Sequence, residues 1–378
     1  MRVLISCSFS PSLVNFRGEL IKEFMVKGYE VHVSGPDLLN DKELCGWLRV
    51  NGVIGHNVDL ERTGFNPISD LKYFLNIFRL INRIKPNLFF AYTAKPVIWG
   101  GFAASISKVP VRVFLITGLG YAFIRKNTVK SFLLRLLMTG LYRLALARAT
   151  LVFFQNKDDR LDFIKSRILS DDSSSIIVNG SGVDTKYYSP TPFKTGKIVF
   201  LLIARLLVSK GIREYVTAAK RIRNAGHDVE FHLVGAVEEG PDQIPIEEIY
   251  GWQKSDIVKW MGQVKDVRPF ISASHVYVLP SYREGTPRSV LEAMSMGRPI
   301  ITTDTPGCRE TVEENINGFL VKVSDVDALK NAMLKFIEDR TLIKKFGRNS
   351  RHIVKQKFDV DKVNDAILTA IEQNNRKL

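Results

Sequence analysis

The chain has 378 residues, 45% of them hydrophobic and 25% charged, which is typical of a folded chain with room for two domains. Its three cysteines lie far apart, so they predict neither a disulfide framework nor a zinc cluster. The apolar run at the N-terminus is too short for a signal peptide, and no uncharged apolar stretch reaches the roughly 18 residues that a membrane-spanning helix needs.

Positive charge is concentrated in the first half of the chain, and the net charge is +15. Residues 1–196 carry 26 Lys and Arg against 15 Asp and Glu, whereas residues 197–378 carry 28 against 24. Between Asp70 and Asp158 there are 14 Lys and Arg and no acidic residue. A basic surface mixed with apolar groups suits an anionic membrane surface, although a skewed solvated face is the alternative. Nucleic acid is not expected as a partner, because no motif that reads RNA or DNA is present.

Short apolar strands alternate with helical patterns along the first half, as in βαβ units that build a parallel sheet. The expected strands contain RVLISCS, YEVHVSG, NLFFAYT, VRVFLIT, ATLVFFQN and SIIVNGSG. Helices are expected near 14–27, near 69–85 with Ser69 as the cap, around the AAS segment, and over the basic region near 128–148.

The pattern restarts after SPTPFKTG at 189–196, whose Pro, Ser and Gly content is typical of a linker. The second series has strands at KIVFLLIAR, VEFHLVG, 275–279 and 299–303, and helices at IREYVTAAKRIRNAG, 287–296 and 325–338. We predict two doubly wound α/β domains that face each other across a cleft lined by strand ends. Their boundaries are 1–188 and 197–356, and an amphipathic helix in 357–378 should pack back on the first domain.

A helix start follows the strand at 275–279. Pro287 suits the first helical position, where its missing N–H costs nothing. The N–H groups of Arg288, Ser289 and Val290 would then be free to hold a phosphate, with the helix dipole in support.

Two carboxylates, Glu284 and Glu292, lie on either side of this helix start. Glu284 could accept two hydroxyl groups of a sugar, and Glu292 could accept those of a ribose. The spacing therefore suits a nucleotide diphospho-sugar. The alternative is that Glu284 caps the helix and Glu292 is exposed to solvent.

A pair of cations, Arg205 and Lys210, occurs in IARLLVSKG between a strand and the next helix. A guanidinium and an ammonium that reach one edge of a sheet are suited to hold a diphosphate.

Three segments resemble the signature segments of family-4 retaining glycosyltransferases, whose fold is GT-B: IARLLVSKGIREYV, SYREGTPRSVLEAMSMGRPIITTDTPGCRE and NGSGVDTKYYSP. That family places a Glu, seven residues and a second Glu within EGxPxxxLEAMxxGxPVI. Glu284 and Glu292 match the two glutamates, and Arg205 and Lys210 match the family's diphosphate-binding pair. The resemblance is close over 179–320 and looser elsewhere.

Two segments in the first half of the chain indicate a subgroup within this family. GFNPISDLKYFLNIFRLINRIKPNLFF and LITGLGYAF are similar to segments of bacterial enzymes that extend saccharides linked to undecaprenyl diphosphate. The resemblance implies transfer of a hexose or N-acetylhexosamine, best N-acetylgalactosamine, from UDP with retained configuration. Such an enzyme would serve the assembly of bacterial surface polysaccharide or glycoprotein glycans. It would need no cofactor or essential metal, and it would rest peripherally on the cytosolic face of the inner membrane.

The resemblance also assigns roles. Residues 197–356 would bind the donor, and residues 1–188 would face the acceptor and the membrane. Glu284, Arg205 and Lys210 would be catalytic. The donor would bind through Arg205, Lys210, Gly285, Thr286, Pro287, Arg288, Ser289 and Glu292. The acceptor candidates are Asn15, Arg17, Lys95 and Thr117. Many relatives carry a His near the end of the fourth strand, where this chain reads ITGLG, so no base is assigned.

Weaker patterns are read as structural. The DVD triplets at 325–327 and 359–361 begin helices, where Asp serves as a cap, and they do not predict a metal site. GLG at 118–120 lacks the third glycine of a dinucleotide fingerprint. Two other functions stay open: a UDP-N-acetylhexosamine epimerase of the same architecture, and a non-catalytic basic binding protein.

Overall fold

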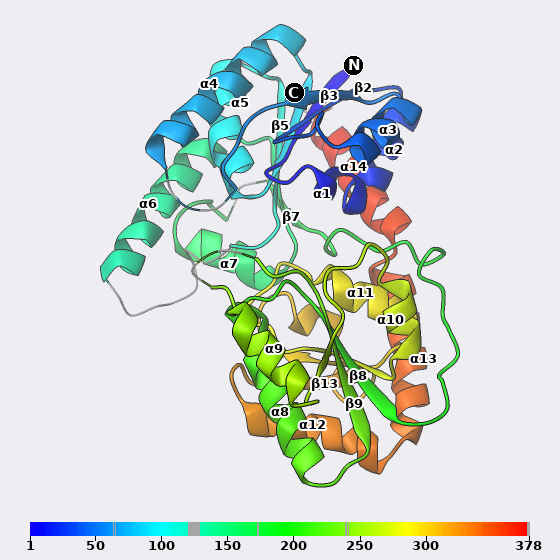
Figure 1. Ribbon diagram of the computed structural model, residues 1–378. Helices are drawn as coiled ribbons and strands as arrows, with labels where there is room; N and C mark the ends of the chain where they lie inside the picture. The colour runs from blue at the N-terminus through cyan, green and yellow to red at the C-terminus, as the bar shows by residue number, and fades with distance from the viewer. Residues whose placement is uncertain are drawn as a thin grey trace. The chain divides into compact units, whose positions relative to one another are not determined.

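The computed structural model describes residues 1–62, 64, 66–119, 129–171, 174–238, 240 and 242–375, with only the backbone described at 130, 131 and 375. Gly120 and the three residues after it, which belong to the LITGLGYAF segment, lie outside this range. The chain forms two compact units, one of residues 1–181 with 361–378 and one of residues 182–360 (Figure 1). No helix among the described residues is long and apolar enough to cross a membrane.

Unit 1 is built on a seven-stranded parallel sheet with the order β3-β2-β1-β4-β5-β6-β7. The middle strands are apolar on both faces, as expected for a sheet that helices cover on both sides. The strands are β1 (Arg2–Ser6), β2 (Glu30–Gly35), β3 (Ile54–Asn57), β4 (Leu88–Tyr92), β5 (Val111–Ile116), β6 (Leu151–Phe154) and β7 (Ser175–Ile177).

Two layers of helices cover this sheet. Side chains of α2, α3 and α14 pack with Val3 and Ile5 on one face, and those of α4, α5, α6 and α7 pack with Leu4 on the other. The helices of unit 1 are α1 (Pro11–Asn15), α2 (Gly18–Val26), α3 (Lys42–Val50), α4 (Pro67–Ile84), the π-helix η1 (Pro96–Gly100), α5 (Gly101–Ile106), α6 (Val129–Leu146), α7 (Lys157–Lys165) and α14 (Val360–Asn375).

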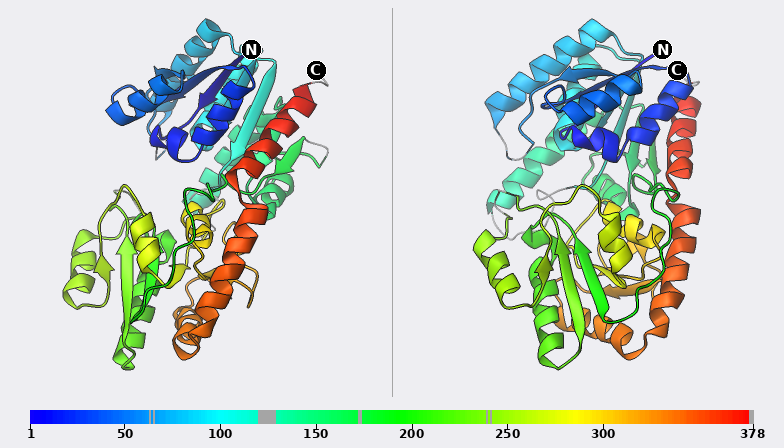
Figure 2. Two further views of the ribbon diagram at one scale, coloured as in Figure 1. Left: turned by 90° about the vertical axis from the view of Figure 1, so that its right-hand side faces the viewer. Right: turned by 45° about the vertical axis from the view of Figure 1, so that its right-hand side comes forward.

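Unit 2 repeats the arrangement of a parallel sheet between helices (Figure 2). The sheet has six strands in the order β10-β9-β8-β11-β12-β13. Its strands are β8 (Ile198–Ile203), β9 (Val229–Val234), β10 (Lys259–Trp260), β11 (Val276–Leu279), β12 (Ile300–Thr303) and β13 (Gly318–Val321). Its helices are the 3₁₀ turns η3 (Val208–Lys210) and η4 (Arg309–Thr311), with α8 (Ile212–Asn224), α9 (Ile246–Lys254), α10 (Arg268–Ala273), α11 (Arg288–Ser295), α12 (Val326–Glu338) and α13 (Thr341–Lys357). Helices α8, α9 and α12 share one core with the sheet, and α10 and α11 share the other.

The predicted fold class, two doubly wound parallel-sheet domains, is therefore confirmed. Two local predictions are wrong. The helix expected near 14–27 is two helices, α1 and α2, which the backbone at Phe16 and Arg17 separates. The cap of α4 is Asn66, whose side chain accepts hydrogen bonds from the N–H groups of Ile68 and Ser69.

The segment between the units belongs to unit 2 from Gly182 onward. Its first residues are tied to the end of α13: Val183 donates to the Phe358 carbonyl at 2.9 Å, and Val360 donates to the Val183 carbonyl at 3.0 Å. Beyond Val360, helix α14 returns to unit 1 and contributes Val363, Ile367, Leu368, Ala370 and Ile371 to its core.

Candidate active site

Several loops of unit 2 meet where β8, β9, β11 and β12 end, which is the edge where open parallel sheets bind ligands. Two glycines allow the backbones of these loops to come into contact. A Cβ on Gly211 would lie 2.1 Å from the Pro280 carbonyl oxygen, and a Cβ on Gly307 would lie 2.2 Å from that of Gly285. Both glycines also have a positive φ, of 69° and 78°, which other residues rarely adopt. These contacts fix the loop that carries Glu284 against its neighbours.

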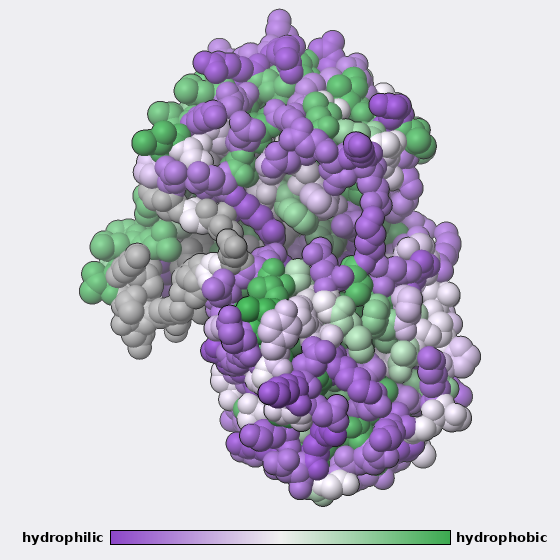
Figure 3. All heavy atoms as spheres, in the orientation of Figure 1, coloured by the Kyte–Doolittle hydropathy of each residue, from purple (hydrophilic) through white to green (hydrophobic). Residues whose placement is uncertain are grey.

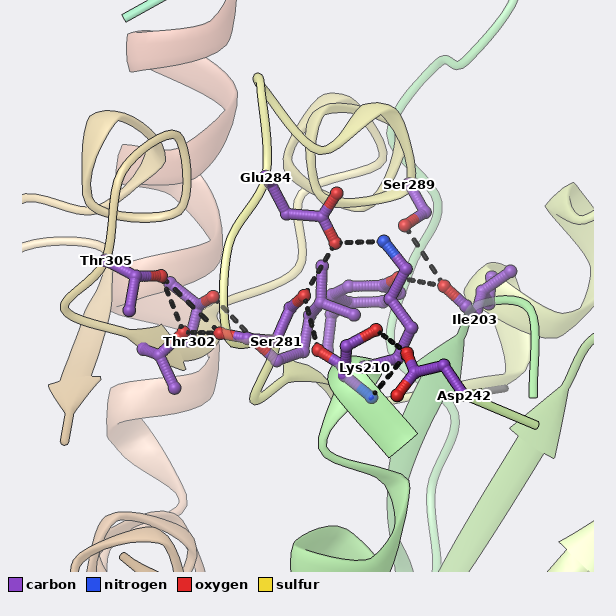
Figure 4. Close-up of polar contacts among 12 residues, drawn as sticks. Ile203, Lys210, Asp242, Ser281, Glu284, Ser289, Thr302 and Thr305 are labelled. Carbon is purple, nitrogen blue, oxygen red and sulfur yellow. Dashed lines mark hydrogen bonds and ion pairs between the residues drawn. The ribbon is translucent and has the colours of Figure 1, made fainter. Parts of the chain in front are cut away.

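Glu284 and Lys210 form the centre of this site (Figure 4). The Lys210 Nζ lies 2.5 Å from Glu284 Oε1, and both side chains are mostly buried. The Ser281 hydroxyl donates to the same oxygen at 2.8 Å. The other carboxylate oxygen of Glu284 points away from both donors (Figure 4). The two predicted residues are thus brought together, with one carboxylate oxygen held and the other directed away.

The turn that carries Lys210 is itself anchored. Ser209 donates to the Asp242 carboxylate through its hydroxyl and, at 3.2 Å, through its N–H. The Ser209 carbonyl in turn accepts from the N–H of Tyr282 at 2.8 Å. The sequence predicted neither Ser281 nor Asp242. Ser281 could have been suspected, since it follows a buried strand three residues before Glu284, whereas Asp242 gives no local signal.

Arg205 takes a different partner from Lys210. Its Nη1 lies 2.5 Å from Glu238 Oε2, in the loop after β9, and its side chain is 42% exposed. The loops meet because Gly235 has no Cβ, which would lie 1.8 Å from the Ala204 carbonyl oxygen. The two cations follow β8 on the same loop, but the structure pairs each with a different glutamate.

The start of α11 differs in detail from the prediction. Pro287 is the cap, with an extended backbone, and Arg288 is the first helical residue. The N–H of Val290, predicted to be free, donates to the Pro287 carbonyl at 3.1 Å. The Ser289 hydroxyl donates to the Ile203 carbonyl at 3.1 Å, so this side chain ties α11 to the end of β8. The positive end of the α11 dipole still points at the loop of Gly285 and Thr286.

Glu292 lies one turn into α11, and Arg288 Nε is 3.2 Å from its Oε1. Burial raises the pKa of the Glu292 carboxyl above its ordinary value, while Arg288 and the Tyr188 hydroxyl act in the opposite direction. Tyr188 was not singled out from the sequence, although it belongs to the NGSGVDTKYYSP segment. Glu292 is therefore neither a cap nor an exposed residue, and it lies near the loop that carries Glu284.

The acceptor candidates all belong to unit 1, and they differ in exposure. Asn15 is exposed at the end of α1, and Thr117 is half-buried just after β5. Arg17 is only 2% exposed, with its guanidinium carbon 5.3 Å from the centre of the Tyr92 ring. Lys95 lies 2.7 Å from the buried Asp70 carboxylate. Arg17 and Lys95 therefore have interaction partners within unit 1, Tyr92 and Asp70, which the sequence did not predict.

The architecture matches a known fold. Anabaena HepE, solved in complex with UDP, superposes with a TM-score of 0.76 at 18% identity, covering 99% of this chain and 100% of that one. The fold of the chain is GT-B.

Family models identify the chain more narrowly. Residues 184–375 match the family described as glycosyl transferases group 1, and residues 8–156 match the one described as glycosyl transferase 4-like. The chain belongs to the group 1 glycosyltransferases.

Two relatives that match at least 80% of the chain are 26–27% identical to it. One is the N,N'-diacetylbacillosaminyl-diphospho-undecaprenol alpha-1,3-N-acetylgalactosaminyltransferase of Campylobacter jejuni, 26% identical with 93% of each chain covered. Another is the UDP-Gal:alpha-D-GlcNAc-diphosphoundecaprenol alpha-1,3-galactosyltransferase of Escherichia coli, 27% identical over 80% of this chain and 81% of the relative. These matches favour a transferase over the epimerase and the non-catalytic binding protein.

Proposed function

We propose that the protein transfers a hexose or N-acetylhexosamine, best N-acetylgalactosamine, from UDP to a saccharide linked to undecaprenyl diphosphate. The two relatives described above act on diphospho-undecaprenol-linked saccharides by name, and one of them uses a UDP-sugar. The observation that carries the proposal is the Glu284–Lys210 pair at the strand ends, held beside the start of α11.

In this mechanism the departing UDP gains negative charge as its bond to the sugar breaks. Lys210, Arg205 and the dipole of α11 are the groups that would stabilise this charge. Glu284 would hold ring hydroxyls of the donor through the oxygen that Lys210 and Ser281 do not contact. Glu292 would accept hydroxyls of the ribose. Transfer would proceed with retained configuration and without an essential metal.

The decisive experiment is a donor screen. The purified protein is incubated with UDP-N-acetylgalactosamine, UDP-N-acetylglucosamine, UDP-galactose or UDP-glucose and an undecaprenyl-diphosphate-linked monosaccharide. We expect the acceptor to gain the mass of one N-acetylhexosamine, with the anomeric configuration of the donor in the product's NMR spectrum. Turnover should persist in the presence of a metal chelator. An isomerised UDP-sugar formed without acceptor, or no product from any donor, would contradict the proposal.

The acceptor side is tested by Asn15→Ala and Thr117→Ala, because Arg17 is buried and Lys95 pairs with the buried Asp70, so that replacing either would also disturb the fold. A higher KM for the lipid-linked acceptor at an unchanged KM for the UDP-sugar is the expected result for a residue that contacts the acceptor.

A further inference from the structure

Helix α6 exposes a continuous apolar stripe. Six of its side chains are between 42% and 76% exposed: Val129, Phe132, Leu133, Leu136, Leu137 and Leu144. Their spacing of three, four or seven residues places them on one side of a helix. Figure 3 shows hydrophobic side chains gathered over the first turns of α6. An exposed apolar surface of this length indicates a binding surface.

The stripe is not the face that holds α6 to its own unit. The opposite side of the helix packs into the core through the buried side chains of Tyr142 and Leu146, with Met138 and Leu141 beside them. A helix that is apolar on both sides is expected where both sides are covered. The inner side of α6 is covered by η1, α5 and α7, whereas its outer side is left exposed.

A second, shorter stripe lies on α4, where Ile68, Leu71 and Leu75 are exposed. Helices α4 and α6 cover the same side of the sheet, since the inner side chains of both belong to one core. Hydrophobic side chains also gather over the start of α4 in Figure 3. We call the exposed stripes of the two helices the α6–α4 face.

The two helices of this face carry mostly positive charge, and the acidic side chains beside α4 are Asp59, which lies 3.8 Å from Lys72, and Glu61, which accepts from Asn66. Neither α6 nor α4 beyond Asp70 contains an acidic residue. The Asp70 carboxylate is itself buried beside Lys95. Arg143 donates to the backbone carbonyls of Ser166 and Arg167, which are uncharged acceptors.

Arg148, just after α6, is exposed, and its backbone carbonyl accepts from Arg112 at 2.7 Å. Burial, and secondly the charge of Arg148, lower the pKa of Arg112. Two arginines thus lie close together at this end of α6, which favours a partner with negative charge around an apolar interior.

We propose that the α6–α4 face docks on the surface of an anionic lipid bilayer. The stripe of α6 would lie in the plane of the interface at the level of the first acyl carbons, with the flanking cations among the headgroups. This inference rests on the proposed function for its biological setting, because a lipid-linked acceptor reaches the enzyme at a bilayer. The physical argument comes from the apolar stripes and the charges alone.

The test is flotation with sealed vesicles of phosphatidylglycerol and phosphatidylcholine, compared with vesicles of phosphatidylcholine alone. The test variant is Phe132→Ser with Leu136→Ser, on the stripe. Its matched control is Val26→Ser with Val50→Ser, since both side chains are more than 80% exposed on other helices of unit 1. We expect the test variant to lose vesicle binding by about tenfold or more, and the control to stay within about twofold of wild type.

A charge variant tests the headgroup contribution. Arg148→Gln should weaken binding to the anionic vesicles by about fivefold and leave binding to neutral vesicles unchanged. Equal binding of wild type to both kinds of vesicle would contradict the anionic surface. Flotation of the stripe variant at the wild-type level would contradict the α6–α4 face.

Two further measurements separate the outcomes. Sedimentation of the wild type must show a monomer without vesicles, because a dimer that the stripe variant dissociates would make the face a contact between two copies. Turnover is then measured in solution with a short-chain, water-soluble prenyl-diphosphate acceptor. The stripe variant should retain wild-type turnover there and lose it on vesicles. No turnover by the wild type with either acceptor would refute the proposed function and leave the flotation result standing.

Discussion

At the scale of residues, the main feature is a carboxylate whose two oxygens are not equivalent. Lys210 and Ser281 both donate to Oε1 of Glu284, so the carboxylate is orientated before a ligand arrives. A preorganised group loses little entropy when it binds, and the same ammonium is then near the place where UDP would develop charge. The pair suits a site that positions a sugar and stabilises a leaving group at one point.

Replacing Lys210 tests this arrangement. Lys210→Ala should lower kcat by about 100- to 1,000-fold, the usual result of removing one donor that stabilises transition-state charge. The measurement is the initial rate with the donor identified in the screen. Lys220→Ala, an exposed lysine on α8, is the control and should retain wild-type turnover. Near-normal turnover of Lys210→Ala would remove Lys210 from the mechanism.

The buried carboxylate Glu292 leads to a prediction about pH. Its raised pKa means that the folded state holds the proton more tightly than the unfolded state. Its contribution to stability is therefore present below the ordinary pKa and is lost as pH rises through the raised one. Glutamine does not titrate, so Glu292→Gln removes this loss. The change in Tm from pH 4 to pH 7 should therefore be more favourable in the variant than in wild type, by a few degrees.

The same substitution should weaken UDP binding. Loss of a hydrogen bond from a ribose hydroxyl to a charged acceptor is expected to reduce the affinity by about tenfold or more, as measured by calorimetry. Glu247→Gln, an exposed glutamate on α9, should change neither quantity. An unchanged UDP affinity for Glu292→Gln would show that Glu292 does not contact the nucleotide.

At this scale the sequence could predict which residues belong to the site, but not which side chains pair with one another. Glu284 and Lys210 were chosen from separate segments because each lies beside a strand end and a helix start, and parallel strands bring such ends together. The pairing of Arg205 with Glu238 and of Lys95 with Asp70 could not be predicted. Which side chains pair in loops or across helices depends on loop conformation and helix packing, and the hydrophobic pattern of a sequence does not specify these. For the same reason Arg17 was expected to be accessible and is buried.

At the scale of elements, the loop between β8 and α8 depends on a single glycine. Gly211 combines a positive φ with a Cβ position 2.1 Å from the Pro280 carbonyl oxygen. Gly211→Ala should therefore destabilise the protein by about 2–4 kcal/mol and separate Lys210 from Glu284. Gly226→Ala is the matched control, since it has a positive φ but no atom within 4 Å of the added Cβ, and it should cost about 1 kcal/mol.

Urea unfolding measures both effects. Equal losses in the two variants would mean that backbone strain, and not the approach to Pro280, makes Gly211 necessary.

Element prediction succeeded at the middle strands and at several helices, but it missed short strands as well as other helices, among them α13 with its 17 residues. The middle strands of both sheets and the helices α8, α11 and α12 lie within a few residues of the predicted ranges. The edge strands β3, β10 and β13 were missed, because they are two to four residues long and lack a clear apolar alternation. The break between α1 and α2 was missed as well, since the apolar pattern continues across it.

At the scale of the whole molecule, the last helix completes the core of the first unit. Ile367 of α14 is fully buried among side chains of α2 and the central strands. Ile367→Ala should cost about 2–5 kcal/mol. Hydrogen exchange should rise in peptides of unit 1 and stay unchanged in those of unit 2. Thr369→Ala, on the exposed side of α14, should change neither. Faster exchange across unit 2 as well would show that the two units unfold together.

The order of the chain has a consequence for biosynthesis. The unit that begins first is finished last: a ribosome that has released residues up to 360 has delivered all of the second unit, while the first still lacks Val363, Ile367 and Leu368. Until those arrive, the apolar face that α14 covers stays open to water, and the nascent protein exposes a surface that chaperones recognise.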